Sequence, residues 1–115
     1  MKPEQFIREF GVEKAKKVVE SHSKAYMPEL FKYWSEELQD YVLAPNYASF
    51  LVEDLKRLVE SVDQVDAFDY GLAEAKDLLS NMKRSKEKYT IDFEVPAFEQ
   101  VIRDYESIYG TESQP

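Results

Sequence analysis

The chain of 115 residues contains no cysteine, a single histidine and three glycines, and each scarcity removes a class of protein. Without cysteine there is no disulfide scaffold and no thiolate metal site, and one histidine excludes the zinc motifs that need two. The glycines Gly11, Gly71 and Gly110 are isolated, so no glycine-rich turn brings backbone amides close to a phosphate. The sequence therefore lacks the commonest metal-binding and nucleotide-binding signatures.

The chain also lacks a long apolar run and an excess of basic residues. We expect neither a signal peptide nor a membrane span, and hence a cytoplasmic protein. The 15 basic and 23 acidic residues give a net charge of −8, which opposes direct binding to nucleic acid or to anionic membranes. The excess is uneven, because residues 35–82 hold 11 acidic and 3 basic residues.

What is present is the composition of a globular protein, with 43% hydrophobic and 33% charged residues. The length predicts a compact single domain over residues 1–110, followed by a disordered tail at 111–115.

The spacing of apolar residues predicts a mainly α fold of about five helices. Proline and glycine mark several of the expected helix ends, with Pro96 opening the last helix, Gly11 and Gly110 ending two others, and Asn46 or Ser49 capping a central one. Helices are predicted over residues 3–10, 12–21, 51–68, 72–82 and 96–109, and Gly11 either joins the first two or kinks one continuous helix.

Residues 27–44 leave two alternatives open. Apolar residues at steps of three and four, with Pro28 near the start, predict a long helix over 27–42. The many aromatic and β-branched residues instead favour strands at 30–34 and 41–44, ahead of a turn at Pro45.

Strict alternation of apolar and polar residues over 89–95 predicts one half-buried strand. A single strand needs a partner, which is either residues 41–44 of the same chain or residues 89–95 of a second copy. The fold class is thus mainly α with one short strand or strand pair, and α+β is the alternative.

Residues with catalytic potential are few. His22 lies between two serines at a predicted helix end, where a surface or capping role is favoured over a catalytic triad. Asp63, Asp66 and Asp69 recur every third residue, so on a helix they spread around the axis instead of converging on a cation. We expect no enzymatic activity, no metal and no cofactor, with a carboxylate-metal hydrolase as the remote alternative.

The aromatic residues, eight Tyr, seven Phe and one Trp, exceed what a core of this size requires. Some tyrosines must therefore be at the surface, where tyrosine is a frequent interface anchor. Tyr41 and Tyr47 lie close in sequence to the acidic segment, while a platform for stacking bases would need a basic groove that the sequence does not supply.

Two segments, residues 3–15 (PEQFIREFGVEKA) and 54–63 (DLKRLVESVD), resemble stretches of small accessory, early-region proteins of enterobacterial phages and prophages. The resemblance covers about a fifth of the chain and carries no catalytic motif. It implies a small early-expressed protein that acts in the host bacterial cytoplasm by binding a component of the host or of a competitor.

These observations lead to one functional hypothesis, a modulator that docks an acidic, tyrosine-bearing surface onto a basic, nucleic-acid-binding site of a partner protein. The concrete version is an anti-CRISPR-like inhibitor acting as a DNA mimic. The alternative is a non-inhibitory structural or assembly adaptor that homodimerises. The candidate partner-binding residues are Glu36, Glu37, Asp40, Tyr41, Tyr47, Glu53, Glu60, Asp63, Asp66 and Asp69.

Overall fold

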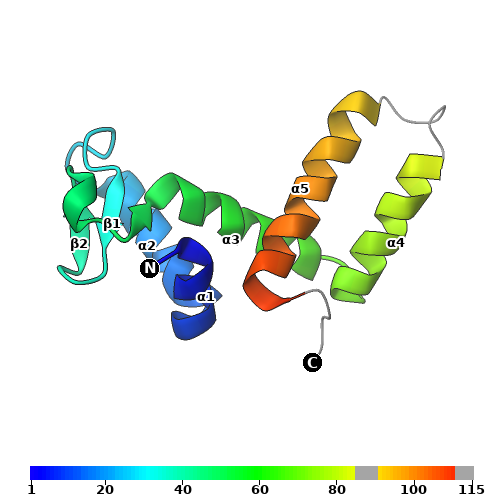
Figure 1. Ribbon diagram of the computed structural model, residues 1–115, viewed down its shortest axis with the longest axis horizontal. Helices are drawn as coiled ribbons and strands as arrows, with labels where there is room; N and C mark the ends of the chain where they lie inside the picture. Colours follow the sequence, from blue (N-terminus) through cyan, green and yellow to red (C-terminus); the bar gives the residue numbers. More distant parts are fainter. Residues whose placement is uncertain (85–90, 111–115) are drawn as a thin grey trace. The chain divides into compact units, whose positions relative to one another are not determined.

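The computed structural model describes residues 1–84 and 91–110, and over these residues the protein is mainly α-helical (Figure 1). Five α-helices and one three-stranded antiparallel sheet are present in this part of the chain, which confirms the predicted fold class. The chain divides into two compact units, Met1–Val59 and Glu60–Pro115, called here the N-terminal and C-terminal units. The predicted tail at 111–115 lies outside the described residues.

Two consecutive helices begin the N-terminal unit, α1 (Pro3–Phe10) and α2 (Val12–Lys24). Gly11 separates them with φ +90° and ψ 157°, a backbone conformation that is essentially restricted to glycine, and its N–H donates to the Ile7 carbonyl at 2.8 Å. The predicted helix end at Gly11 is confirmed, and α2 continues three residues past its predicted end at Ser21.

The small sheet contains β1 (Tyr33–Ser35), β2 (Asp40–Val42) and β3 (Phe50–Leu51) in the order β2-β1-β3. The register pairs Trp34 with Tyr41 on one side and with Phe50 on the other, both antiparallel. The predicted helix over 27–42 is therefore wrong, and the strand alternative is nearer, with shifted bounds. Met27 and Gln39 have φ values of 48° and 53°, which a continuous right-handed helix does not allow.

A short 3₁₀ turn, η1 (Pro45–Tyr47), and β3 precede the central helix α3 (Val52–Asp66). The helix was predicted, but its predicted cap at Asn46 or Ser49 is wrong because the sheet intervenes. The Ser49 N–H donates to the Trp34 carbonyl at 2.7 Å, which extends the pairing of the sheet. Buried hydrophobic residues of this unit are Phe6, Ile7, Ala15, Val18, Trp34, Phe50, Val52, Leu55, Leu58 and Val59.

The C-terminal unit contains the end of α3 followed by α4 (Gly71–Arg84) and α5 (Ile91–Tyr109), and the last two lie side by side (Figure 1). Helix α4 confirms the helix predicted over 72–82. The core of the unit is formed by Val65, Leu72, Ala75 and Ile102, with Phe68, Leu79, Phe98, Val101 and Tyr105 packed against it.

The strand predicted over 89–95 is wrong where the structure describes it, because α5 begins at Ile91. Tyr89 and Thr90 lie outside the described residues. Pro96 stands inside α5 instead of opening it, while the predicted end at Gly110 is confirmed by a 2.7 Å bond from its N–H to the Glu106 carbonyl. Alternation over only seven residues did not distinguish a strand from the start of a helix.

Candidate functional site

The acidic excess of the chain belongs almost entirely to the C-terminal unit. That unit contains 13 acidic and 6 basic residues, whereas the N-terminal unit contains 10 acidic and 9 basic residues. The acidic segment noted in the sequence, residues 35–82, crosses the boundary between the two units. By net charge, however, the C-terminal unit is the part suited to a cationic partner.

Three candidate aspartates lie at the end of α3 and directly after it. Asp63 and Asp66 are three residues apart on α3, which makes them neighbours on the helix surface, and Asp69 follows in the turn before α4. All three side chains are exposed. Within α3, which is described throughout, the last turn holds no basic residue to offset the partial negative charge of the helix C-terminus. A cation at this end would be stabilised both by the carboxylates and by the helix dipole.

Two tyrosines of α5, Tyr105 and Tyr109, lie within electrostatic range of Asp66. Burial raises the pKa of the Tyr105 phenol, and the nearby Asp66 carboxylate raises it further. The pKa of Tyr109 is raised by burial first, then by Tyr105 and Asp66, and the two rings are 4.9 Å apart between centroids. Tyr109 is 44% exposed, so part of this ring faces solvent. We call Asp63, Asp66, Asp69, Tyr105 and Tyr109 the acidic surface.

The other acidic candidates do not gather at that place. Glu60 is exposed on α3 in the C-terminal unit, whereas Glu53 is exposed on the first turn of α3 in the N-terminal unit. Glu36 and Glu37 lie in the β1–β2 connection, where Glu37 is exposed and Glu36 accepts a 3.0 Å hydrogen bond from the indole N–H of Trp34. The structure thus divides the predicted residues between the two units.

Tyr41 is committed to contacts within the N-terminal unit. Its hydroxyl donates to the Val18 carbonyl at 2.5 Å, and its ring packs edge-on against His22 and Trp34, at centroid distances of 5.1 and 5.2 Å. Burial is the main cause that raises the pKa of this phenol. Tyr41 therefore connects β2 to α2 and β1 through its side chain, although that side chain is partly exposed. Tyr47 falls in η1, and its side chain lies outside the described part of the structure.

Sequence reasoning missed Tyr109 as a surface tyrosine, because it was assigned with Tyr105 to the buried stripe of the last helix, whereas only Tyr105 packs against the core. Asp66 is far from both along the chain, and only the fold brings it next to them. Tyr70 was also missed, although its place between Asp69 and Gly71 is a turn signal that favours exposure. It is 81% exposed.

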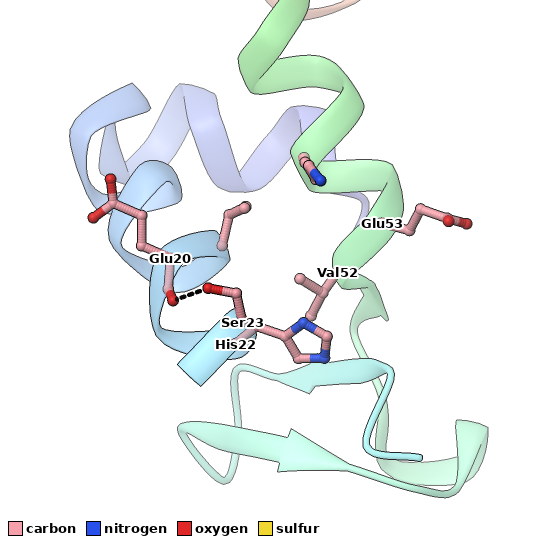
Figure 2. Close-up of a pocket in the computed structure, with 7 residues that line it drawn as sticks. Glu20, His22, Ser23, Val52 and Glu53 are labelled. Carbon is pink, nitrogen blue, oxygen red and sulfur yellow. Dashed lines mark hydrogen bonds between the residues drawn. The ribbon is translucent and has the colours of Figure 1, made fainter. Parts of the chain in front are cut away.

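A pocket in the N-terminal unit surrounds His22 (Figure 2). It has a volume of about 380 Å³ and is lined by α2 and the first turns of α3 through Val19, Glu20, His22, Ser23, Val52, Glu53 and Lys56. The carboxylates of Glu20 and Glu53 point away from the imidazole, as Figure 2 shows. The pocket therefore does not direct these carboxylates at the histidine.

The hydrogen bonds of this pocket do not link serine to histidine. His22 Nε2 lies 2.9 Å from the Phe31 carbonyl, and since a carbonyl only accepts, Nε2 is the donor. Ser23 Oγ donates to the Glu20 carbonyl at 2.7 Å. A histidine that activates a serine must accept the serine's proton, whereas here each group donates to the backbone. The His22 contact thus ties α2 to the segment before β1, whereas the Ser23 contact stays within α2.

Neither a metal site nor a membrane-spanning helix is found among the described residues. Across residues 1–84 and 91–110, no group of three or more His, Asp or Glu side chains is placed to hold a metal ion. Among the helices described, none combines the length and the apolar composition needed to cross a bilayer. Comparisons of the chain with protein-family models, with curated proteins and with solved structures gave no match.

Proposed function

We propose that this protein is a protein-binding module whose acidic surface, on the C-terminal unit, occupies a basic, nucleic-acid-binding site of a partner protein. The observation that carries the proposal is the set of exposed carboxylates Asp63, Asp66 and Asp69 at the end of α3 and directly after it, where the last turn of the helix holds no basic residue. The phenols of Tyr105 and Tyr109 lie within electrostatic range of Asp66. Carboxylates on a helix take the place of phosphates, and the phenols supply contact area.

The chemistry of the acidic surface matches what a phosphate-binding site offers. Arginine and lysine bind carboxylates and phosphates through the same charge-assisted hydrogen bonds. Asp63 and Asp66 are held on one rigid helix, so little conformational entropy is lost when a partner binds them. Tyrosine is enriched among the residues that contribute most to binding energy, and Tyr109 is exposed enough to be reached.

In its specific form the proposal is an inhibitor of phage or prophage type, acting in the bacterial cytoplasm on a defence complex of the host or of a competitor. Its support is the resemblance of residues 3–15 and 54–63 to early-region phage proteins, together with the acidic charge of the C-terminal unit. The homodimeric adaptor was expected to associate through helices or through a strand at 89–95, and only the strand route is removed, because the chain is helical from Ile91 onward.

The test is affinity capture from an enterobacterial lysate with three forms of the protein, read by quantitative mass spectrometry. The first form is the wild type, and the second reverses charge at Asp63→Lys, Asp66→Lys and Asp69→Lys. The third, Glu9→Lys, Glu20→Lys and Glu29→Lys, makes the same change in net charge at exposed positions of the N-terminal unit.

We expect the wild type and the N-terminal control to capture the same basic partner, and the C-terminal reversal to lose it. Circular dichroism and the urea midpoint show whether each form is folded. Equal capture by both triple variants would show that the acidic surface has no role in binding.

A further inference from the structure

A second cavity of the N-terminal unit lies between the end of α2 and the start of β2. Its volume is about 180 Å³, and it is lined by Ala25, Tyr26, Phe31, Asp40 and Tyr41. Three of these residues are aromatic and the single charged one is a carboxylate. Aromatic faces and a carboxylate both attract cations, so the lining has a consistent chemical preference.

Two of the aromatic walls are held in place by hydrogen bonds to or from α2. His22 Nε2 donates to the Phe31 carbonyl at 2.9 Å, and the Tyr41 hydroxyl donates to the Val18 carbonyl at 2.5 Å. The Phe31 N–H is also bonded, to the Met27 carbonyl at 3.2 Å. The backbone at Phe31 and the ring of Tyr41 are therefore held before any ligand arrives, which lowers the entropy lost on binding.

The third wall, Tyr26, is exposed and directly follows the cap of α2. Its side chain is 80% exposed, and the next residue, Met27, has a φ of 48° that turns the chain back toward β1. An exposed aromatic ring beside an aromatic cavity lies where it can cover a bound group. This ring contributes little to the core, so it can be removed without unfolding the unit.

Asp40 supplies the charge. Its Oδ1 accepts the Tyr41 N–H at 2.8 Å, which holds the carboxylate in the lining of the cavity. Within residues 1–84 and 91–110 no cationic side chain forms an ion pair with it. The same carboxylate contributes, after burial, to the raised pKa of Tyr41 and so lies close to that wall.

We propose that this cavity binds the guanidinium group of an arginine side chain. A guanidinium stacks on aromatic faces and donates hydrogen bonds in its plane, so it satisfies the rings and Asp40 together. A quaternary ammonium ion would satisfy the rings but has no N–H for the carboxylate. The site lies in the N-terminal unit and does not depend on the acidic surface of the C-terminal unit.

The experiment is an NMR titration of the full chain with acetyl-argininamide, compared with acetyl-lysinamide and tetramethylammonium chloride at equal ionic strength. The ring signals of Tyr26, Phe31 and Tyr41 should shift with acetyl-argininamide, and the δ protons of the ligand should move upfield because they lie over the rings. We expect the affinity order arginine, then lysine, then tetramethylammonium.

Two variants separate the contributions of the ring and the charge. Tyr26→Ala should weaken binding about 2- to 5-fold without changing its salt dependence, since it removes a cation–π contact. Asp40→Asn should weaken binding by a similar factor, about 2- to 5-fold, and should also reduce the salt dependence. The matched controls are Tyr70→Ala, an equally exposed tyrosine of the other unit, and Glu37→Gln, an exposed carboxylate outside the lining.

An affinity for acetyl-argininamide that is unchanged in both Tyr26→Ala and Asp40→Asn would overturn the proposal, as would the absence of ring shifts in the wild type. Tetramethylammonium binding as tightly as acetyl-argininamide would overturn the guanidinium assignment. Reversal of Asp63, Asp66 and Asp69 to lysine should leave the titration unchanged, so the two proposals fail independently.

Discussion

Ser61 on α3 donates a hydrogen bond of 2.8 Å to the Asp104 carboxylate on α5, and both side chains are buried in the C-terminal unit. Asp104 also accepts from the Gln100 amide at 2.8 Å. A carboxylate removed from water is tolerated only when its oxygens are hydrogen-bonded. This pair therefore holds together two helices that both contribute to the acidic surface.

The first prediction concerns this hydrogen bond. Ser61→Ala deletes a buried donor and leaves Asp104 with less compensation, so we expect the free energy of unfolding to fall by about 1–3 kcal/mol. Urea denaturation measures the loss. Ser80→Ala, at an exposed position of α4, is the matched control and should change stability by less than about 0.5 kcal/mol. An equal effect of the two changes would contradict the role given to Ser61.

The second prediction concerns the junction of α1 and α2. Gly11 has φ +90°, and an added Cβ would meet no atom within 4 Å, so the cost of a side chain there is conformational and not steric crowding. We expect Gly11→Ala to destabilise the protein by about 1–3 kcal/mol, measured by thermal or urea unfolding. Lys17→Ala, at an exposed position of α2, should have little effect. Unchanged stability of Gly11→Ala would show that the junction relaxes freely.

The third prediction concerns the phenols beside Asp66. Burial and the Asp66 carboxylate raise the pKa of Tyr105 and Tyr109, so Asp66→Asn should lower both pKa values toward the ordinary one while burial keeps them above it. NMR titration with ¹³C-labelled tyrosine resolves the individual rings. The pKa of Tyr41, raised by burial and by Asp40, is the internal control and should not move.

The sign of the linked stability change follows from these raised pKa values. Below about pH 10, where unfolded tyrosine is protonated, the contribution of the two phenols to stability is complete. It is lost as the pH rises through the folded pKa values, because the unfolded chain ionises first. We expect Asp66→Asn to reduce this alkaline loss. A larger loss in the variant would show that Asp66 does not raise these pKa values.

The helices were predictable where apolar spacing and end signals agreed. The Gly11 and Gly110 ends and the helix over 72–82 all follow from local patterns that the structure keeps. The structure of residues 27–42 does not follow from their pattern, since the same apolar steps also suit a hairpin. Its turn contains Gln39 and the segment before it begins at Met27, and both residues have positive φ although neither residue type signals it. The opposite error was made for residues 91–95, whose alternation predicts a strand although they are helical in the structure.

The candidate site was only partly predictable, for a different physical reason. Net charge can be counted along the sequence without knowledge of the fold, so the cluster formed by Asp63, Asp66 and Asp69 is visible there. Which tyrosines accompany it is decided by tertiary packing, which brings Tyr105 and Tyr109 of α5 to Asp66. Tyr41 was chosen because it is near the acidic segment in sequence, a criterion that does not establish proximity in the fold.

The most direct test of the central claim is competition for the captured partner. The complex formed with the wild-type protein is immobilised through its partner and challenged with increasing concentrations of the nucleic acid that the partner binds, while the released protein is quantified. The account predicts release at nucleic-acid concentrations near the partner's own dissociation constant, and faster release at higher salt. A ternary complex of partner, nucleic acid and this protein, with no release, would contradict it.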